Sequence, residues 1–136
     1  MTAGRLVIDT NVISYIFKGD TRGPHYERLI QGHQTILPFQ VVAELEEWML
    51  NDRWSEPRRE RLRNYLHQYV VIESDERMGR IWGAVRHACQ KAGRRIDPAD
   101  AWIAATALAL RCPLVTHNAA DFAGVPNLKL ITEQAP

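Results

Sequence analysis

Residues 96–122 read I-D-P-A-D-A-W-I-A-A-T-A-L-A-L-R-C-P-L-V-T-H-N-A-A-D-F, which is a helix headed by acids, then a short strand, then a polar turn. Asp97 precedes a proline, as is typical of a helix N-cap with proline at the first helical position. Asp100 then falls in the first turn. We expect the helix to end near Arg111, because Pro113 disfavours helical backbone in the residue before it.

The strand that follows, residues 114–116, is apolar enough to be internal, and Asp121 comes shortly after its carboxyl end. The N-terminal region has the same arrangement: residues 5–8 predict a buried strand that ends on Asp9. Open parallel sheets bind ligands just beyond the carboxyl ends of their strands. We therefore expect Asp9, Asp100 and Asp121 to lie at one edge of a sheet.

Strands and helices alternate through the rest of the chain. Apolar runs predict three further strands, the second of them buried, at residues 34–37, 70–72 and 128–131. Helical periodicity and capping signals predict helices at residues 12–17, 24–31, 40–51, 58–69 and 75–91. The alternation predicts a single domain over residues 1–136 with a three-layer α/β/α fold, in which helices flank both faces of a parallel central sheet.

Composition sets few limits on function. The chain has 136 residues, of which 46% are hydrophobic, as is ordinary for a globular domain with its own core. A transmembrane helix is not expected because no apolar run reaches about 18 residues, and the first five residues do not resemble a signal peptide. We therefore expect a cytoplasmic protein. Cys89 and Cys112 lack metal or redox spacing and are expected to be buried.

Four acids could form one functional site. The fourth, Glu44, lies in the first turns of the helix predicted at residues 40–51, where it could equally be an ordinary surface residue near a positive helix end. Carboxylates held close together repel one another, and a divalent cation removes that conflict. Because the ligands would all be oxygens, Mg²⁺ or Mn²⁺ is the expected ion. Such a site favours phosphodiester hydrolysis.

The polar turn supplies further candidates. Thr116 and Asn118 could orient a water or hold a carboxylate, and Asn11 could do the same from the other side. We expect His117 to face solvent. Asp97 is interpreted as the helix cap and Asp100 as the site acid, although each could cap the helix. Nucleotide-cofactor and serine-hydrolase motifs are absent from the sequence.

Four segments together resemble PIN-domain ribonucleases, and more narrowly the VapC toxins of bacterial and archaeal toxin–antitoxin pairs. They are L-V-I-D-T-N-V (6–12), V-V-A-E-L (41–45), D-A-W-I-A-A-T-A-L-A-L (100–110) and L-V-T-H-N-A-A-D-F (114–122). The resemblance implies a catalytic and metal-binding quartet, with two polar residues beside it: Asp9, Glu44, Asp100 and Asp121, then Thr116 and Asn118. It also implies a Mg²⁺- or Mn²⁺-dependent endoribonuclease that cleaves RNA, is inhibited by a cognate VapB-like antitoxin and forms a homodimer.

Other functions fit the same residues. A housekeeping nuclease for RNA processing would share the fold and the quartet. A non-catalytic binding module would use the carboxylates as helix caps and as a docking surface. A phosphoaspartyl phosphatase is disfavoured, because Asn11 stands where a second Asp would be wanted. Contacts to the RNA backbone are expected from basic residues, namely Lys91, Arg94, Arg95 and the 58–63 arginines, while Trp48 and Trp54 are candidates either for antitoxin contact or for the core.

Overall fold

The computed structural model describes residues 4–133 and contains a five-stranded sheet with six α-helices and one 3-10 helix. The strands are β1 (Arg5–Ile8), β2 (Gln34–Pro38), β3 (Val70–Ile72), β4 (Leu114–Val115) and β5 (Leu130–Ile131). The helices are α1 (Thr10–Lys18), α2 (Gly23–Ile30), α3 (Phe39–Asn51), α4 (Glu56–Leu66), α5 (Glu76–Lys91), α6 (Pro98–Leu110) and the 3-10 helix η1 (Ala119–Phe122).

The sheet is parallel throughout, in the order β3-β2-β1-β4-β5. Strands β2 and β3 lie on one side of β1 in the sheet, and β4 and β5 lie on its other side. The strand order therefore reverses between β1 and β4, where Val7 is in register with Leu114. Ligands of open α/β sheets bind beyond the carboxyl ends of the strands at such a reversal.

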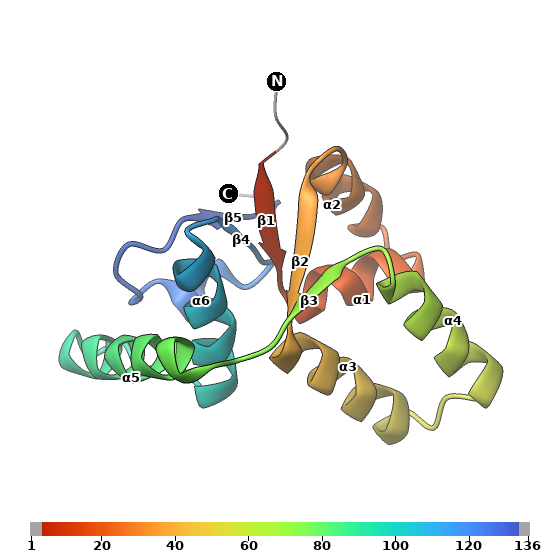
Figure 1. Cartoon of the computed structure of the whole chain (residues 1–136). Helices are drawn as coiled ribbons and strands as arrows, with labels where there is room; N and C mark the ends of the chain where they lie inside the picture. The colour runs from red at the N-terminus through yellow and green to blue at the C-terminus, as the bar shows by residue number, and fades with distance from the viewer. Residues whose placement is uncertain (1–3, 134–136) are drawn as a thin grey trace.

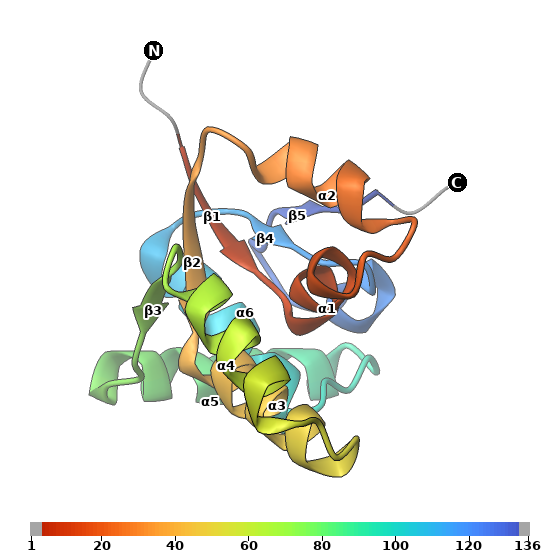
Figure 2. The same cartoon turned by 90° about the vertical axis from the view of Figure 1, so that its right-hand side faces the viewer.

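Helices cover both faces of the sheet, which confirms the predicted three-layer architecture. Helices α1 and α2 lie on one side and α5 and α6 on the other (Figure 1). The turned view shows α1, α2 and α4 in front of the sheet and α6 behind it (Figure 2). Strand β1 leads into α1 at the same end of the sheet where β2 leads into α3, so these helix N-termini meet at the carboxyl edge (Figure 1).

The core includes the contact between β1 and α6. The three apolar residues of β1 are buried, and α6 buries alanines on several of its faces, so this helix can approach β1 and β2 closely. A helix that is apolar almost all round belongs in the interior of a protein. Cys89 is buried as expected, whereas Cys112 is only half-buried. Within residues 4–133, no helix is long and apolar enough to cross a lipid bilayer.

Two predictions about the chain's middle third were wrong. Strand β3 forms where expected but is not buried, because it is an edge strand of the sheet: Val70 is 44% exposed and Val71 is 47% exposed. Helix α4 ends at Leu66, three residues before the predicted end. The next residues turn sharply, with the Tyr69 amide donating to the Leu66 carbonyl, before β3 begins.

Candidate active site

Asp9 lies at the carboxyl end of β1 and caps α1. Its side chain is buried, and its Oδ1 accepts a hydrogen bond of 2.7 Å from the Thr10 amide. Its Oδ2 accepts one of 2.7 Å from the Thr116 hydroxyl and one of 3.5 Å from the Asn11 amide group. The carboxylate is therefore held by groups from both sides of the strand-order reversal.

Glu44 reaches the same region from α3. The Thr10 hydroxyl donates to Glu44 Oε1 at 2.5 Å, so the first residue of α1 contacts one acid through its backbone and another through its side chain. The second oxygen, Oε2, has no hydrogen-bond partner among the described residues. One oxygen of the Glu44 carboxylate is therefore held in place, and the other is free to bind a ligand.

Asp100 occupies the first turn of α6 and is half-buried. The adjoining Asp97 caps this helix as predicted, because its side chain accepts from the Ala99 amide at 2.9 Å. The Asp100 side chain makes no hydrogen bond within residues 4–133. A carboxylate near a helix N-terminus that is not needed as its cap is available for another role.

Asp121, Asn118 and Thr116 come from the segment after β4. Thr116 is fully buried, and its hydroxyl accepts from the Asn118 amide at 3.1 Å while donating to Asp9. The Asp121 amide donates to the Asn118 carbonyl at the start of η1. The Asn118 and Asp121 side chains are exposed toward the same pocket. Thr116 thus connects the turn to the buried Asp9.

All four acids line one open pocket of about 350 Å³. Its walls are Asp9, Thr10, Asn11, Ser14, Glu44, Trp48, Asp100, Asn118 and Asp121. Of the six catalytic residues that the resemblance implies, five line this pocket; Thr116 does not, and it is hydrogen-bonded to the buried Asp9. Thr10 and Ser14 were not singled out, although they are four residues apart and therefore lie on one face of α1.

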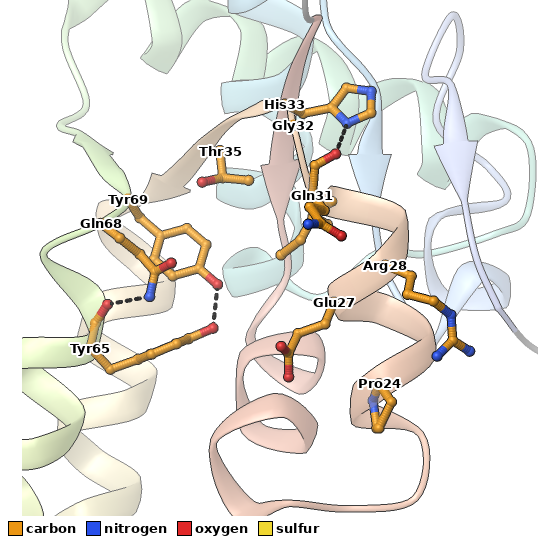
Figure 3. A pocket seen from close by; sticks show the side chains of 11 residues that line it. Pro24, Glu27, Arg28, Gln31, Gly32, His33, Thr35, Tyr65, Gln68 and Tyr69 are labelled. Atoms are coloured by element: carbon orange, nitrogen blue, oxygen red, sulfur yellow. Dashed lines mark hydrogen bonds between the residues drawn. The ribbon is translucent and has the colours of Figure 1, made fainter.

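A larger cavity lies elsewhere and holds none of these acids. It has a volume of about 700 Å³, and Figure 3 shows Tyr65, Gln68 and Tyr69 on one side and α2 residues such as Glu27 on the other. The Tyr65 and Tyr69 hydroxyls are hydrogen-bonded to each other at 2.6 Å. Size alone therefore does not identify the active site, and the carboxylates are the better guide.

The acids lie close enough to perturb one another. Burial raises the pKa of Asp9 to about 6, against the lowering effect of the hydrogen bonds from Thr116 and Thr10, and the charges of Glu44 and Asp121 raise it further. Burial raises the pKa of Asp100 to about 7, and four neighbouring carboxylates add to the effect, with Asp9 foremost. None of the four acids has an ion-pair partner among the described residues, so no direct contact with a cationic side chain offsets their mutual repulsion.

The prediction that His117 faces solvent was wrong. Its Nδ1 is 2.7 Å from the Tyr26 hydroxyl, and its ring meets those of Tyr15 and Tyr26 edge-on. Its backbone amide donates to Asn11 Oδ1 at 3.1 Å. His117 therefore packs against α1 and α2, does not line the acid pocket, and joins the turn to both helices.

The two tryptophans near α3 differ in their surroundings. Trp54 is buried, stacks on Phe17 with ring centroids 5.6 Å apart, and carries the Arg58 guanidinium over its face. Trp48 is half-buried and lines the acid pocket, and its indole N–H donates to Asp52. Of the two alternatives left open for Trp54, the structure therefore supports core packing.

The donors fit a hard divalent cation, although the side chains do not form a closed cage. Within residues 4–133, no group of three or more His, Cys, Asp or Glu side chains is gathered tightly enough to hold a metal ion. Mg²⁺ commonly binds through one or two carboxylates and completes its shell with water and substrate phosphate. Asp9 and Asp100 line an open pocket, which is compatible with that mode of binding.

Comparison with known proteins adds independent findings. The family model for the PIN domain matches residues 6–128. Ribonuclease VapC1 of Haemophilus influenzae strain R2866 is 26% identical over 125 residues, which cover 90% of this chain and 93% of that protein. Ribonuclease VapC2 of Rickettsia felis is 26% identical over 126 residues, which cover 91% of this chain and 94% of that protein.

Solved structures share the fold over nearly the whole chain. VapBC-1 from nontypeable Haemophilus influenzae gives a TM-score of 0.81 at 26% identity, covering 94% of this chain and 97% of that chain. VapBC2 from Rickettsia felis, bound to a DNA fragment from its promoter, gives a TM-score of 0.84 at 23% identity, covering 96% and 99%. At 23% identity, the similarity to VapBC2 shows a shared fold and nothing more.

Proposed function

The chain belongs to the PIN domain family, and we propose that it is an endoribonuclease that hydrolyses RNA phosphodiester bonds as the toxin of a VapBC-type pair. The observation that carries this proposal is the pocket at the strand-order reversal, onto which four carboxylates from four separate elements converge. The ribonuclease names of the VapC relatives support the same reaction.

In this proposal Asp9, Glu44, Asp100 and Asp121 hold a Mg²⁺ or Mn²⁺ ion. The ion would supply Lewis acidity, making a water more acidic and offsetting negative charge on the phosphate. Ion binding would also offset the burial and the repulsion that raise the pKa values of Asp9 and Asp100. The support for metal dependence is therefore the donor chemistry and the uncompensated charge of the pocket.

The neighbouring residues have supporting roles. Thr116 and Asn11 hold Asp9 in place, and the Thr10 hydroxyl fixes Glu44 through Oε1. Glu44 lines the pocket and its Oε2 has no hydrogen-bond partner among the described residues, so we assign this oxygen to accept a proton from the attacking water. Asn118 lies on the rim, where its amide can orient that water or a substrate oxygen.

The alternative of a binding module made of helix caps is less consistent with the hydrogen bonds. Asp97 already caps α6, and Asp100 and Asp121 make no side-chain hydrogen bonds within the described residues. Acids that served only as caps would bond to helix amides, as Asp75 does with the Met78 amide. We therefore favour an enzyme over a module.

Cleavage assays test the enzymatic proposal directly. Purified protein is incubated with structured RNA in Mg²⁺, in Mn²⁺ and in EDTA, alongside Asp9→Asn, Asp100→Asn and the exposed control Glu47→Gln. We expect metal-dependent cleavage that both aspartate variants reduce at least about a hundredfold and the control retains. Equal cleavage in EDTA, or full activity of both aspartate variants, would contradict the proposal.

A VapB-like antitoxin is one proposed partner, as the VapBC structures similar to this chain suggest. A second copy of this chain is the other proposed partner. The proposed RNA substrate implies a cytoplasmic location. A housekeeping processing nuclease remains the second candidate, since the same pocket would serve it. Growth arrest on expression, relieved by a small protein encoded beside this gene, would favour the toxin. Normal growth with trimmed precursor RNA would favour the processing enzyme.

A further inference from the structure

A second pocket, of about 520 Å³, adjoins the acid pocket and contains two arginines. It is lined by Arg94, Arg95, Asp97, Asp100, Ala120, Asp121 and Gly124. Asp100 and Asp121 belong to both pockets and therefore form the wall between them. A polymer bound over the acid pocket would therefore extend into the second pocket, where the arginines lie.

Three exposed arginines elsewhere in the described residues are paired with carboxylates. Arg22 binds Asp20, Arg63 binds Glu46 and Glu60, and Arg80 binds Glu76. Arg94 and Arg95 differ from them. Although three aspartates line the same pocket, neither guanidinium has an ion pair or hydrogen bond within residues 4–133. Their donors therefore remain free for a ligand.

The backbone that carries these arginines is fixed, although their side chains are free. On one side, the Arg94 amide donates to the Cys89 carbonyl at 2.9 Å, where α5 ends. On the other, Arg86 donates to the Ile96 carbonyl, and the Ile96 side chain is buried. The two arginines thus start from anchored positions, which reduces the entropy that a ligand must overcome.

Gly124 brings this loop against the turn that carries Asp121. A Cβ at Gly124 would lie 2.8 Å from Arg94 Cβ and 3.1 Å from the Arg94 carbonyl oxygen, so only glycine permits this contact without a shift. Gly124 is three residues after Asp121. The close contact therefore sets the distance between the arginine loop and one of the site acids.

We propose that Arg94 and Arg95 bind a backbone phosphate of the RNA strand next to the phosphate that is cleaved. This inference rests on the proposed ribonuclease function. Guanidinium groups match the oxygens of phosphate with planar, bidentate donors. A small free anion would be repelled by the three aspartates of the pocket, whereas a strand anchored at the neighbouring site brings its next phosphate to the arginines regardless. The ligand is therefore a polymer.

Steady-state kinetics and binding test the assignment with Arg94→Ala, Arg95→Ala and the double variant. Arg77→Ala is the matched control, because Arg77 is exposed, unpaired among the described residues, and at the opposite end of α5. We expect each single variant to raise KM about fivefold and the double variant about twentyfold, with kcat within about twofold of wild type. The melting temperatures should match, because both side chains are exposed.

Binding is measured separately with a fluorescein-labelled single-stranded RNA 12-mer in EDTA, over a series of salt concentrations. Each lost phosphate contact should lower the slope of log affinity against log salt by about 0.7. If the wild type cleaves RNA but the double variant has the KM and salt slope of Arg77→Ala, the subsite is wrong and the ribonuclease stands. A fall in kcat at unchanged KM would also overturn it. If the wild type cleaves no RNA, the binding slope alone decides the subsite.

Discussion

Replacing Asp100 by asparagine should make the metal-free protein more stable and inactive. In the native structure, burial and four surrounding carboxylates raise the pKa of Asp100 to about 7 from an ordinary value of 3.8. A raised carboxyl pKa means that ionisation destabilises the folded state. The stability present at low pH is then lost as the pH rises toward 7, because the folded protein holds a proton that the unfolded chain has released. Asparagine has no charge to repel, so it avoids that loss.

The size of the expected gain in stability follows from the pKa shift of Asp100. If Asp100 were fully buried, a change from 3.8 to about 7 would correspond to about 4 kcal/mol. Asp100 is half-buried, and solvent screens its interactions, so we expect a gain of about 1–2 kcal/mol at pH 7.5. For a domain of this size, that is a rise of roughly 3–8 °C in melting temperature.

Thermal and urea denaturation in EDTA at pH 4.5, 6 and 7.5 measure the difference, with Glu47→Gln as a carboxyl-to-amide control on an exposed residue. The gain for Asp100→Asn should be largest at pH 7.5 and shrink as the pH falls toward 4.5, where the native Asp100 is already protonated. Mg²⁺ should stabilise the wild type more than the variant. A variant no more stable than wild type at pH 7.5, or a gain independent of pH, would refute the reasoning.

Thr116→Val removes the hydroxyl that donates to the Asp9 carboxylate, so the pKa of Asp9 should rise above about 6. The acidic limb of the pH–rate profile should then move to higher pH, and an unchanged limb would contradict this role of Thr116. Gly124→Ala adds a methyl group that would clash with Arg94 Cβ and the Arg94 carbonyl oxygen. Urea denaturation should show that the free energy of unfolding falls by about 1–2 kcal/mol, and the KM for RNA should rise. Unchanged values would mean that the close contact is not required. Trp54→Ala removes a large buried ring and should cost about 3–5 kcal/mol in the same denaturation assay; a loss under about 1 kcal/mol would place the ring outside the core.

The features that sequence predicts best here depend on neighbouring residues. Asp97 followed by proline predicts the start of α6, and the Asp97 side chain does cap that helix. Asp9 at the end of an apolar run predicts an acid at the carboxyl end of a strand, and β1 ends at Ile8. A cap or a strand end is decided by a few consecutive residues, so the information is present locally.

Burial of strand β3 could not be predicted in the same way. Val70-Val71-Ile72 has the composition of an internal strand, yet it forms the sheet's outer edge. Composition reports how apolar a strand is, whereas its burial depends on whether a further strand or a helix covers it. The strand order decides that, and the order is set by packing over the whole chain.

His117 shows the same limit at the level of one side chain. A histidine between Thr116 and Asn118 in a polar turn reads as solvent-facing, but its ring meets Tyr15 and Tyr26 from two other elements. Those tyrosines are 102 and 91 positions away along the chain. Nothing in the local sequence indicates that α1 and α2 pass beside the turn, so the contact becomes visible only when the fold is known.

The acid pocket is predictable because the rule that assembles it is general. In a parallel sheet every strand leaves at the same edge, so Asp9, the turn after β4 and the helix N-termini must meet there. The arrangement opposes stability, since burial and mutual repulsion raise the pKa values of Asp9 and Asp100. A fold selected for stability alone would replace one of these acids by a neutral residue. Asp9 also caps α1, but helix capping does not account for the other three acids, so their joint presence supports the proposed cation site.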